Sequence, residues 1–225
     1  MSTSGFLLIN KPADWTSHDV IAHLRKISGI KTIGHAGTLD PFATGLLIVG
    51  VGREATKKLG LLIKHDKVYE ATFVLGAISN TGDITGEITT NEIKNIPTET
   101  QIQNVLESFI GEQLQTPPMF SAKKVGGRKL YELARQGQTI ERQPAKITIF
   151  SLELLDYTWP NLKIKIHCSS GTYIRSLAKD IGDRLGVGGY VSELNRTAID
   201  KYLLTEATDL KNFNQDNWTD KLINL

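Results

Sequence analysis

Residues 34–45 read Gly-His-Ala-Gly-Thr-Leu-Asp-Pro-Phe-Ala-Thr-Gly and stand directly before the apolar run Leu46–Val49. Glycine and proline at this density predict an irregular loop, and the run that follows predicts a buried strand. Loops held between rigid elements often carry binding and catalytic groups. Because Pro41 follows Asp40, the backbone of Asp40 is driven towards extended conformations, and its side chain could project from the loop. The loop residues alone favour the alternative of an Asx turn, in which Asp40 bonds nearby backbone.

Short strands and helices are predicted on both sides of this loop, without the regular alternation of a doubly wound fold. Strands are predicted over residues 6–9, 46–49, 69–74, 147–155 and 162–168, the last two as a hairpin. Helices are predicted over residues 17–28, 98–109, 129–136 and 174–185. There is no internal repeat and no low-complexity linker, so the pattern favours one α+β domain.

Two of the predicted helices carry sequence signals at their ends. Ser17 is expected to cap the first helix, which Gly29 then ends. Thr98 and Gln101 have the spacing of a capping box.

The composition is that of an ordinary globular protein. The chain has 225 residues, of which 40% are hydrophobic and 22% charged, which excludes disorder and a collagen-like fibre. The apolar runs are far shorter than the ~20 residues of a membrane span, and residues 1–10 lack the basic region of a secretory signal. The single cysteine, Cys168, is expected to be a small buried hydrophobe, and His18 and His23 are wrongly spaced for a shared zinc face. We therefore expect a cytoplasmic protein with no membrane segment and no metal.

Positive charge is concentrated in one segment. The net charge of the whole chain is +2, but residues 122–146 alone carry +5. A run of charges is usually a solvated surface. The alternative is an element that grips phosphates, because clustered cations release counterions when they bind a polyanion.

Six blocks of sequence resemble, in order, the TruB family of tRNA pseudouridine synthases. The loop at 34–45 is similar to the signature loop of that family. The other blocks are Gly5–Pro12 with Thr16-Ser17, Lys67–Ala71, Gln115–Gly137, His167–Leu177 and Leu194–Thr197. The similarity extends from about residue 5 to about residue 202, which is most of the chain.

The resemblance implies an α+β pseudouridine synthase catalytic fold, in which helices flank a mixed, mainly antiparallel sheet. It implies a catalytic domain over residues 1–204, with a mobile, basic, RNA-gripping thumb at about 120–146. Residues 205–225 are expected to form a short tail in place of a PUA domain. Asn80 stands where the family usually has an acidic residue, so the role of that position is left open.

The implied activity is the isomerisation of uridine to pseudouridine at position 55, in the TΨC loop of tRNA. Such an enzyme flips the target base out of the RNA and uses an essential aspartate without any cofactor. The implied partner is the TΨC stem-loop of tRNA, and the protein is expected to be a monomer.

Site residues follow from the resemblance, position by position. The catalytic residues would be Asp40, the essential aspartate; Tyr69, which stacks on the flipped base and helps to remove its C5 proton; and Arg175, which pairs with Asp40. The substrate-binding residues would be His35, Tyr173, Leu194, Lys123 and Lys129. Each of these residues alone has an ordinary structural explanation, and only their joint pattern indicates a site. Two other functions are weighed: an RNA-binding or RNA-folding protein without chemistry, and a hydrolase that pairs Asp40 with a second carboxylate.

Overall fold

The computed structural model describes residues 4–121 and 123–224, and the chain in it forms two compact units. Unit 1 combines the residues up to Glu70 with those from Leu194 onward, and unit 2 is Ala71–Glu193. Strands β4 (Lys67–Leu75) and β12 (Gly189–Ile199) contribute residues to both units.

Unit 1 is built on the long strands β1 (Gly5–Lys11) and β3 (Thr44–Val51), which pair antiparallel with Leu7 opposite Val49. Strand β2 (Ile33–Ala36) pairs antiparallel with β3, and β12 pairs parallel with the start of β3. Two short strands complete this part of the sheet: β13 (Tyr202–Leu203) beside β12 and β14 (Thr208–Asp209) beside β1.

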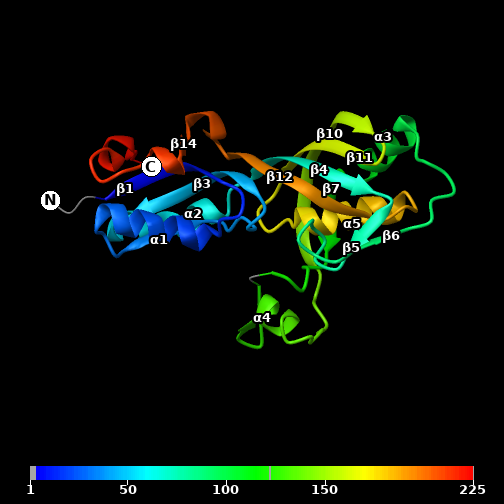
Figure 1. Ribbon diagram of the computed structural model, residues 1–225, viewed down its shortest axis with the longest axis horizontal. Helices are drawn as coiled ribbons and strands as arrows, with labels where there is room; N and C mark the ends of the chain where they lie inside the picture. The colour runs from blue at the N-terminus through cyan, green and yellow to red at the C-terminus, as the bar shows by residue number, and fades with distance from the viewer. Residues whose placement is uncertain (1–3, 122, 225) are drawn as a thin grey trace. The chain divides into compact units, whose positions relative to one another are not determined.

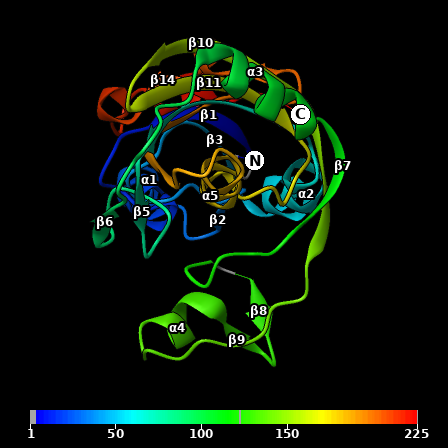
Figure 2. The same cartoon turned by 90° about the vertical axis from the view of Figure 1, so that its right-hand side faces the viewer.

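Helices α1 (Ser17–Ser28) and α2 (Arg53–Ile63) cover opposite faces of these strands, as Figure 2 shows. Side chains alternate along β1, so Leu7 and Ile9 pack in the cluster that contains α1. Phe6 and Leu8 pack in the cluster that contains α2. The loop between β2 and β3 is thereby anchored to a strand that is buried on both faces.

The first helix is capped one residue earlier than expected. The side chain of Thr16, not that of Ser17, accepts the hydrogen bond from the backbone N–H of Asp19, and the Asp19 carboxylate accepts in return from the Thr16 N–H. The prediction for Ser17 was wrong because Thr16 and Asp19 have capping-box spacing. Gly29 ends the helix as predicted, with φ at +70°.

Residues after β13 return to β1. They form the 3₁₀ turns η1 (Leu204–Glu206), η2 (Leu210–Asn212) and η3 (Trp218–Lys221), drawn in orange to red in Figure 1. Leu210, Phe213 and Trp218 enter the same core cluster as α1. Phe6 and Ile223 exchange two backbone hydrogen bonds of 2.9 Å.

In unit 2, β4 is followed across the sheet by β11, β10 and β7. The bounds of these strands are β7 (Gly111–Gln115), β10 (Ala145–Thr158) and β11 (Asn161–Cys168), with a separate pair β5 (Ala77–Ser79) and β6 (Ile88–Thr90). Strands β10 and β11 form the predicted hairpin, and Cys168 is fully buried at its end, as predicted. Helix α3 (Glu99–Ser108) begins at the predicted capping box, and α5 (Ile174–Arg184) follows β11.

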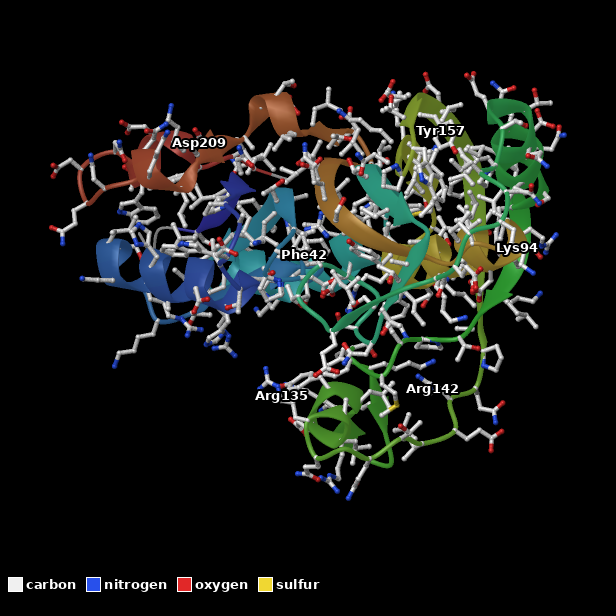
Figure 3. The ribbon with its side chains drawn as sticks, turned by 45° about the vertical axis from the view of Figure 1, so that its right-hand side comes forward. Phe42, Lys94, Arg135, Arg142, Tyr157 and Asp209 are labelled. Atoms are coloured by element: carbon white, nitrogen blue, oxygen red, sulfur yellow. The ribbon has the colours of Figure 1, made fainter. Side chains whose placement is uncertain are left out.

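A segment of unit 2 that is rich in cations extends from the sheet between β7 and β10. We call this segment, residues 120–146, the arm. It contains the hairpin β8 (Lys124–Val125) and β9 (Arg128–Lys129) and the one-turn helix α4 (Leu130–Ala134). Figure 2 shows that it protrudes from the sheet of unit 2. Arg135 lies beside α4, and Arg142 lies on the returning chain (Figure 3).

The architecture confirms the predicted α+β class, with a mixed and mainly antiparallel sheet flanked by helices. Among the described residues, no helix is both long and apolar enough to cross a membrane.

Candidate active site

Asp40 lies in the loop that joins the antiparallel strands β2 and β3 of unit 1. The carbonyl of Asp40 accepts a hydrogen bond of 3.1 Å from the Ala43 N–H, so the chain turns sharply at Pro41. Gly45 is the second residue of β3, where the chain leaves the loop, and its φ is +105°. A Cβ atom at Gly45 would lie 2.4 Å from the carbonyl oxygen of Arg196, which explains the glycine at this point.

The ammonium group of Lys11 ties this loop to the end of β1. Its Nζ donates to three carbonyl oxygens, those of Pro12 (2.8 Å), Trp15 (2.6 Å) and Pro41 (3.2 Å). The side chain is fully buried, and burial lowers the pKa of Lys11 to about 8, with the Arg196 charge acting in the same direction. The Asp40 carboxylate opposes this shift, so the two groups interact across the loop.

A second buried cation, Arg196 of β12, holds the loop from the other side. Its Nε donates to the Leu46 carbonyl at 2.8 Å and its Nη2 to the Gly37 carbonyl at 3.1 Å. Its side chain is 1% exposed. The hydroxyl of Ser17 adds a third anchor, since it accepts from the Leu39 N–H at 2.9 Å and lies 3.3 Å from the Leu39 carbonyl.

Three other predicted site residues also belong to unit 1. His35 stands on β2, half-buried, and burial lowers its pKa, with the charges of Arg196 and His18 acting in the same direction. Its Nδ1 atom is buried and makes no hydrogen bond within the described part of the chain. Tyr69 on β4 and Leu194 on β12 are each 7% exposed.

Tyr173 and Arg175 lie in unit 2, at the start of α5. The guanidinium of Arg175 donates to the carbonyls of Thr81 (3.0 Å) and Phe120 (2.6 Å). It also forms an ion pair with Asp83, both side chains being buried. The pairing of Arg175 with Asp40 stays a prediction.

Asp83 was missed by the sequence analysis. The turn that contains it was considered only for Asn80, whose exposed side chain accepts from the Glu87 N–H at 3.1 Å. Asp83 accepts hydrogen bonds from Thr81 and Thr85, and a carboxylate is the group expected to balance a buried arginine. The acid three residues beyond Asn80 was the signal available in the sequence.

A cavity of about 690 Å³ opens beside Arg175 within unit 2. It is lined by the turn at residues 78–82, by residues 116–119 at the base of the arm, by the exposed side of α5 and by Arg142. The Nε atom of Arg142 is buried without a hydrogen-bond partner within the residues that the structure describes. A half-buried guanidinium that faces a cavity can receive an anion.

The predicted binding residues Lys123 and Lys129 both lie in the arm, and both are half-buried. The Nζ of Lys129 is 3.2 Å from the hydroxyl of Tyr131 and 5.3 Å from the centre of its ring. The hydrogen bond to Tyr131 raises the pKa of Lys129, so this lysine carries its charge at neutral pH. Lys124, Arg128 and Arg135 are the exposed cations beside them.

Among the residues that the structure describes, no three histidine, cysteine or acidic side chains gather in a way that could hold a metal ion.

Comparisons with known proteins identify the family of the chain. The family model described as TruB family pseudouridylate synthase (N terminal domain) matches residues 25–174, and that of the tRNA pseudouridylate synthase B C-terminal domain matches residues 175–223. A protein of Protochlamydia amoebophila named tRNA pseudouridine synthase B is 50% identical over 86% of this chain and 73% of its own length. One of the same name from Opitutus terrae is 45% identical over 92% of this chain and 85% of its own length.

Solved structures give the same answer for the fold. The chain resembles one chain of a Cbf5-Nop10-Gar1 complex with a TM-score of 0.71 and 28% identity, over 92% of its length. It spans about half of that matched chain, 52%. With the family models covering residues 25–223 and relatives above 40% identity, the chain belongs to the TruB family of pseudouridylate synthases, which are isomerases.

Proposed function

We propose that this protein converts uridine 55 in the TΨC loop of tRNA to pseudouridine, in the cytoplasm, as a monomer and without metal or cofactor. The observation that carries the proposal is the way the Asp40 loop is held. Three buried anchors, Lys11, Arg196 and Ser17, fix its main chain on both sides of the aspartate. A carboxylate held in this way can meet a reacting atom without reorganisation.

The reaction is an isomerisation, so its atoms balance without a co-reactant. The bond between ribose C1′ and uracil N1 breaks with the help of Asp40, the uracil turns, and a bond forms between C1′ and C5. The C5 proton then leaves to solvent, and N1 takes up a proton. We assign the removal of the C5 proton to Tyr69, whose ring is also the surface on which the flipped base stacks. Arg175 would keep Asp40 ionised.

Five further residues would bind the RNA. His35 would contact the RNA where the base leaves its stack, and Tyr173 and Leu194 would line the base pocket. Lys123 and Lys129 would place cations against phosphates of the TΨC stem-loop when the arm closes. The surplus positive charge of residues 122–146 supports this role for the arm.

Tritium release tests the reaction directly. A tRNA transcript labelled at C5 of its uridines is incubated with the protein, and we expect one tritium to be released per tRNA. A transcript with cytidine at position 55 should release none. Asp40→Asn keeps the size and hydrogen bonding of the side chain but removes the carboxylate, so release should stop while tRNA affinity stays within about threefold.

Asp14→Asn is the matched control. Asp14 is an exposed acid in the adjoining loop, and it bonds the Pro41 carbonyl through its backbone N–H, which the substitution keeps. It should release tritium at the wild-type rate. If the wild type binds tRNA tightly but releases no tritium, the protein is an RNA-binding protein without chemistry. Free uracil among the products would instead indicate a hydrolase.

A further inference from the structure

The buried side chain of Gln115 forms two hydrogen bonds to the main chain of a single distant residue, Tyr173. Gln115 is the last residue of β7 and is 4% exposed. Its Oε1 accepts from the Tyr173 N–H at 2.8 Å, and its Nε2 donates to the Tyr173 carbonyl at 3.1 Å. The two residues are 58 positions apart in the chain.

This pair of hydrogen bonds replaces a missing strand neighbour. Tyr173 is the N-cap residue of α5, with φ at −98° and ψ at 108°, and within the described residues its own side chain makes no capping hydrogen bond. A carboxamide offers one acceptor and one donor side by side, the same pattern that a strand offers to a neighbouring residue. The amide of Gln115 therefore fixes the backbone from which the Tyr173 side chain and the first turn of α5 start.

The contact begins a seam between the base of the arm and the start of α5. Beyond Gln115, the carbonyl of Thr116 accepts from the hydroxyl of Ser176 at 3.2 Å, and the carbonyl of Phe120 accepts from Arg175 at 2.6 Å. Gln115 is the only one of these three whose side chain makes the bond. It is thus the position where a substitution changes the seam without changing Tyr173 or Arg175 themselves.

We propose that Gln115 is a positioning residue for the isomerisation, which holds Tyr173 and, through the first turn of α5, Arg175 in their working places. The inference rests on the proposed function, because it concerns the same site. It predicts that loss of the amide slows the chemical step and leaves tRNA binding nearly intact.

Gln115→Leu tests the proposal, since leucine fills similar space and can form neither hydrogen bond. With enough enzyme to bind all the tRNA, the single-turnover rate should fall about tenfold or more. The Kd for tRNA should stay within about threefold of the wild-type value. Gln113→Leu is the matched control. Gln113 stands two residues earlier on the same strand, and its Nε2 donates to the Phe109 carbonyl at 2.6 Å instead of to Tyr173. The control should keep the wild-type rate.

Gln115→Glu supplies a readout that simple loss of stability would not give. The protonated carboxyl can accept from the Tyr173 N–H and donate to its carbonyl, as the amide does, whereas the carboxylate has no hydrogen to donate. Burial favours the protonated form. The rate of this variant relative to wild type should therefore rise as the pH falls, and that of Gln113→Glu should not.

Hydrogen exchange separates this inference from the proposed function, because it needs no activity. The Tyr173 N–H should exchange faster in Gln115→Leu and at the wild-type rate in Gln113→Leu. If the wild type released no tritium, the proposed function would fail, and the exchange result would still judge the role of Gln115. Folded Gln115→Leu with a wild-type rate, equal losses in both leucine variants, or a Gln115→Glu profile parallel to wild type would each overturn the proposal.

Discussion

Arg175 and Asp83 form an ion pair in which both side chains are buried, with Nη1 of the arginine 3.3 Å from Oδ2 of the aspartate. The exposed fraction is 6% for the arginine side chain and 5% for that of the aspartate. A buried guanidinium needs such a partner, because removal of one charge leaves the other uncompensated in a poorly solvated place. The same aspartate accepts hydrogen bonds from the hydroxyls of Thr81 (2.8 Å) and Thr85 (2.5 Å). The turn at residues 81–85 thus fixes the arginine of the proposed site.

Asp83→Asn is expected to lower the free energy of unfolding by about 3 kcal/mol and to slow single turnover by about tenfold or more. The asparagine keeps the shape of the side chain but removes the charge opposite Arg175. Urea unfolding and tritium release measure the two effects. Asp183→Asn is the control, because Asp183 pairs with Lys179 on the exposed side of α5, where an ion pair contributes little. Equal losses in both variants would contradict this role for the buried pair.

The activity should fall as the pH rises through about 8, the pKa of Lys11. The neutral amine has two hydrogens for three carbonyl acceptors, so the set of hydrogen bonds that includes the anchor at Pro41 is weakened. The stability should change in the opposite direction. The folded-state pKa lies below the usual 10.5, so between these two values the unfolded chain binds more protons, and this lysine contributes a gain in stability as the pH rises.

The single-turnover rate and the free energy of unfolding in urea, each measured over a series of pH values, check the expected fall in activity and the expected rise in stability. Lys11→Met should remove the alkaline fall in rate that Lys11 causes, at the cost of a lower rate throughout. An alkaline fall that persists unchanged in this variant would assign the effect to another group.

Gly45→Ala should destabilise unit 1 by about 3 kcal/mol, because the new Cβ would meet backbone at 2.4 Å and φ is +105°. Gly60→Ala is its opposite. Gly60 lies on the exposed side of α2 with nothing near its Cβ position, so alanine should stabilise the helix by about 1 kcal/mol. Thermal and urea unfolding of the two variants should shift in opposite directions. A tolerated Gly45→Ala would mean that β12 and the loop can separate.

Lys123→Ala combined with Lys129→Ala should weaken tRNA binding and leave saturated turnover near the wild-type rate. The slope of log affinity against log salt should become shallower by roughly 0.7–0.9 for each phosphate contact that is lost. Lys163→Ala with Lys165→Ala makes the same change of charge on the exposed face of β11, outside the arm, and should keep the wild-type slope. Identical slopes in both double variants would contradict a role for the arm in RNA binding.

The fold and the family were readable from the sequence because their signals are local. The crowded loop at residues 34–45, the alternation along β11 and the capping box at Thr98 each depend on residues that are close in the chain. Helix α1 was placed correctly for the same reason. The error at Ser17 arose because two neighbouring residues, Thr16 and Ser17, can both cap a helix, and only the carboxylate of Asp19 decides between them.

The supporting residues were not readable because their partners are distant. Arg196 bonds Gly37 from 159 positions away, and Gln115 bonds Tyr173 from 58. Neither residue type indicates such a contact, since arginine and glutamine are mostly exposed in proteins. Asp83 is a further case, because a carboxylate in a turn usually bonds the turn itself. Burial, which only the folded chain reveals, distinguishes these side chains from ordinary surface groups.

The return of residues 208–223 to β1 has a consequence for the order in which the protein acquires its structure during synthesis. β1 pairs with β3 nearby in the chain, yet its other neighbour, β14, lies 199 positions later. Ile223, the backbone hydrogen-bond partner of Phe6, is made later still. Residues 71–193 contain both strand partners of β10, so these strands can pair before residues 208–223 have been made. An apolar β1 strand therefore keeps one edge open in the nascent chain until residues 208–223 have been made, and an open strand edge is a site for pairing with other chains.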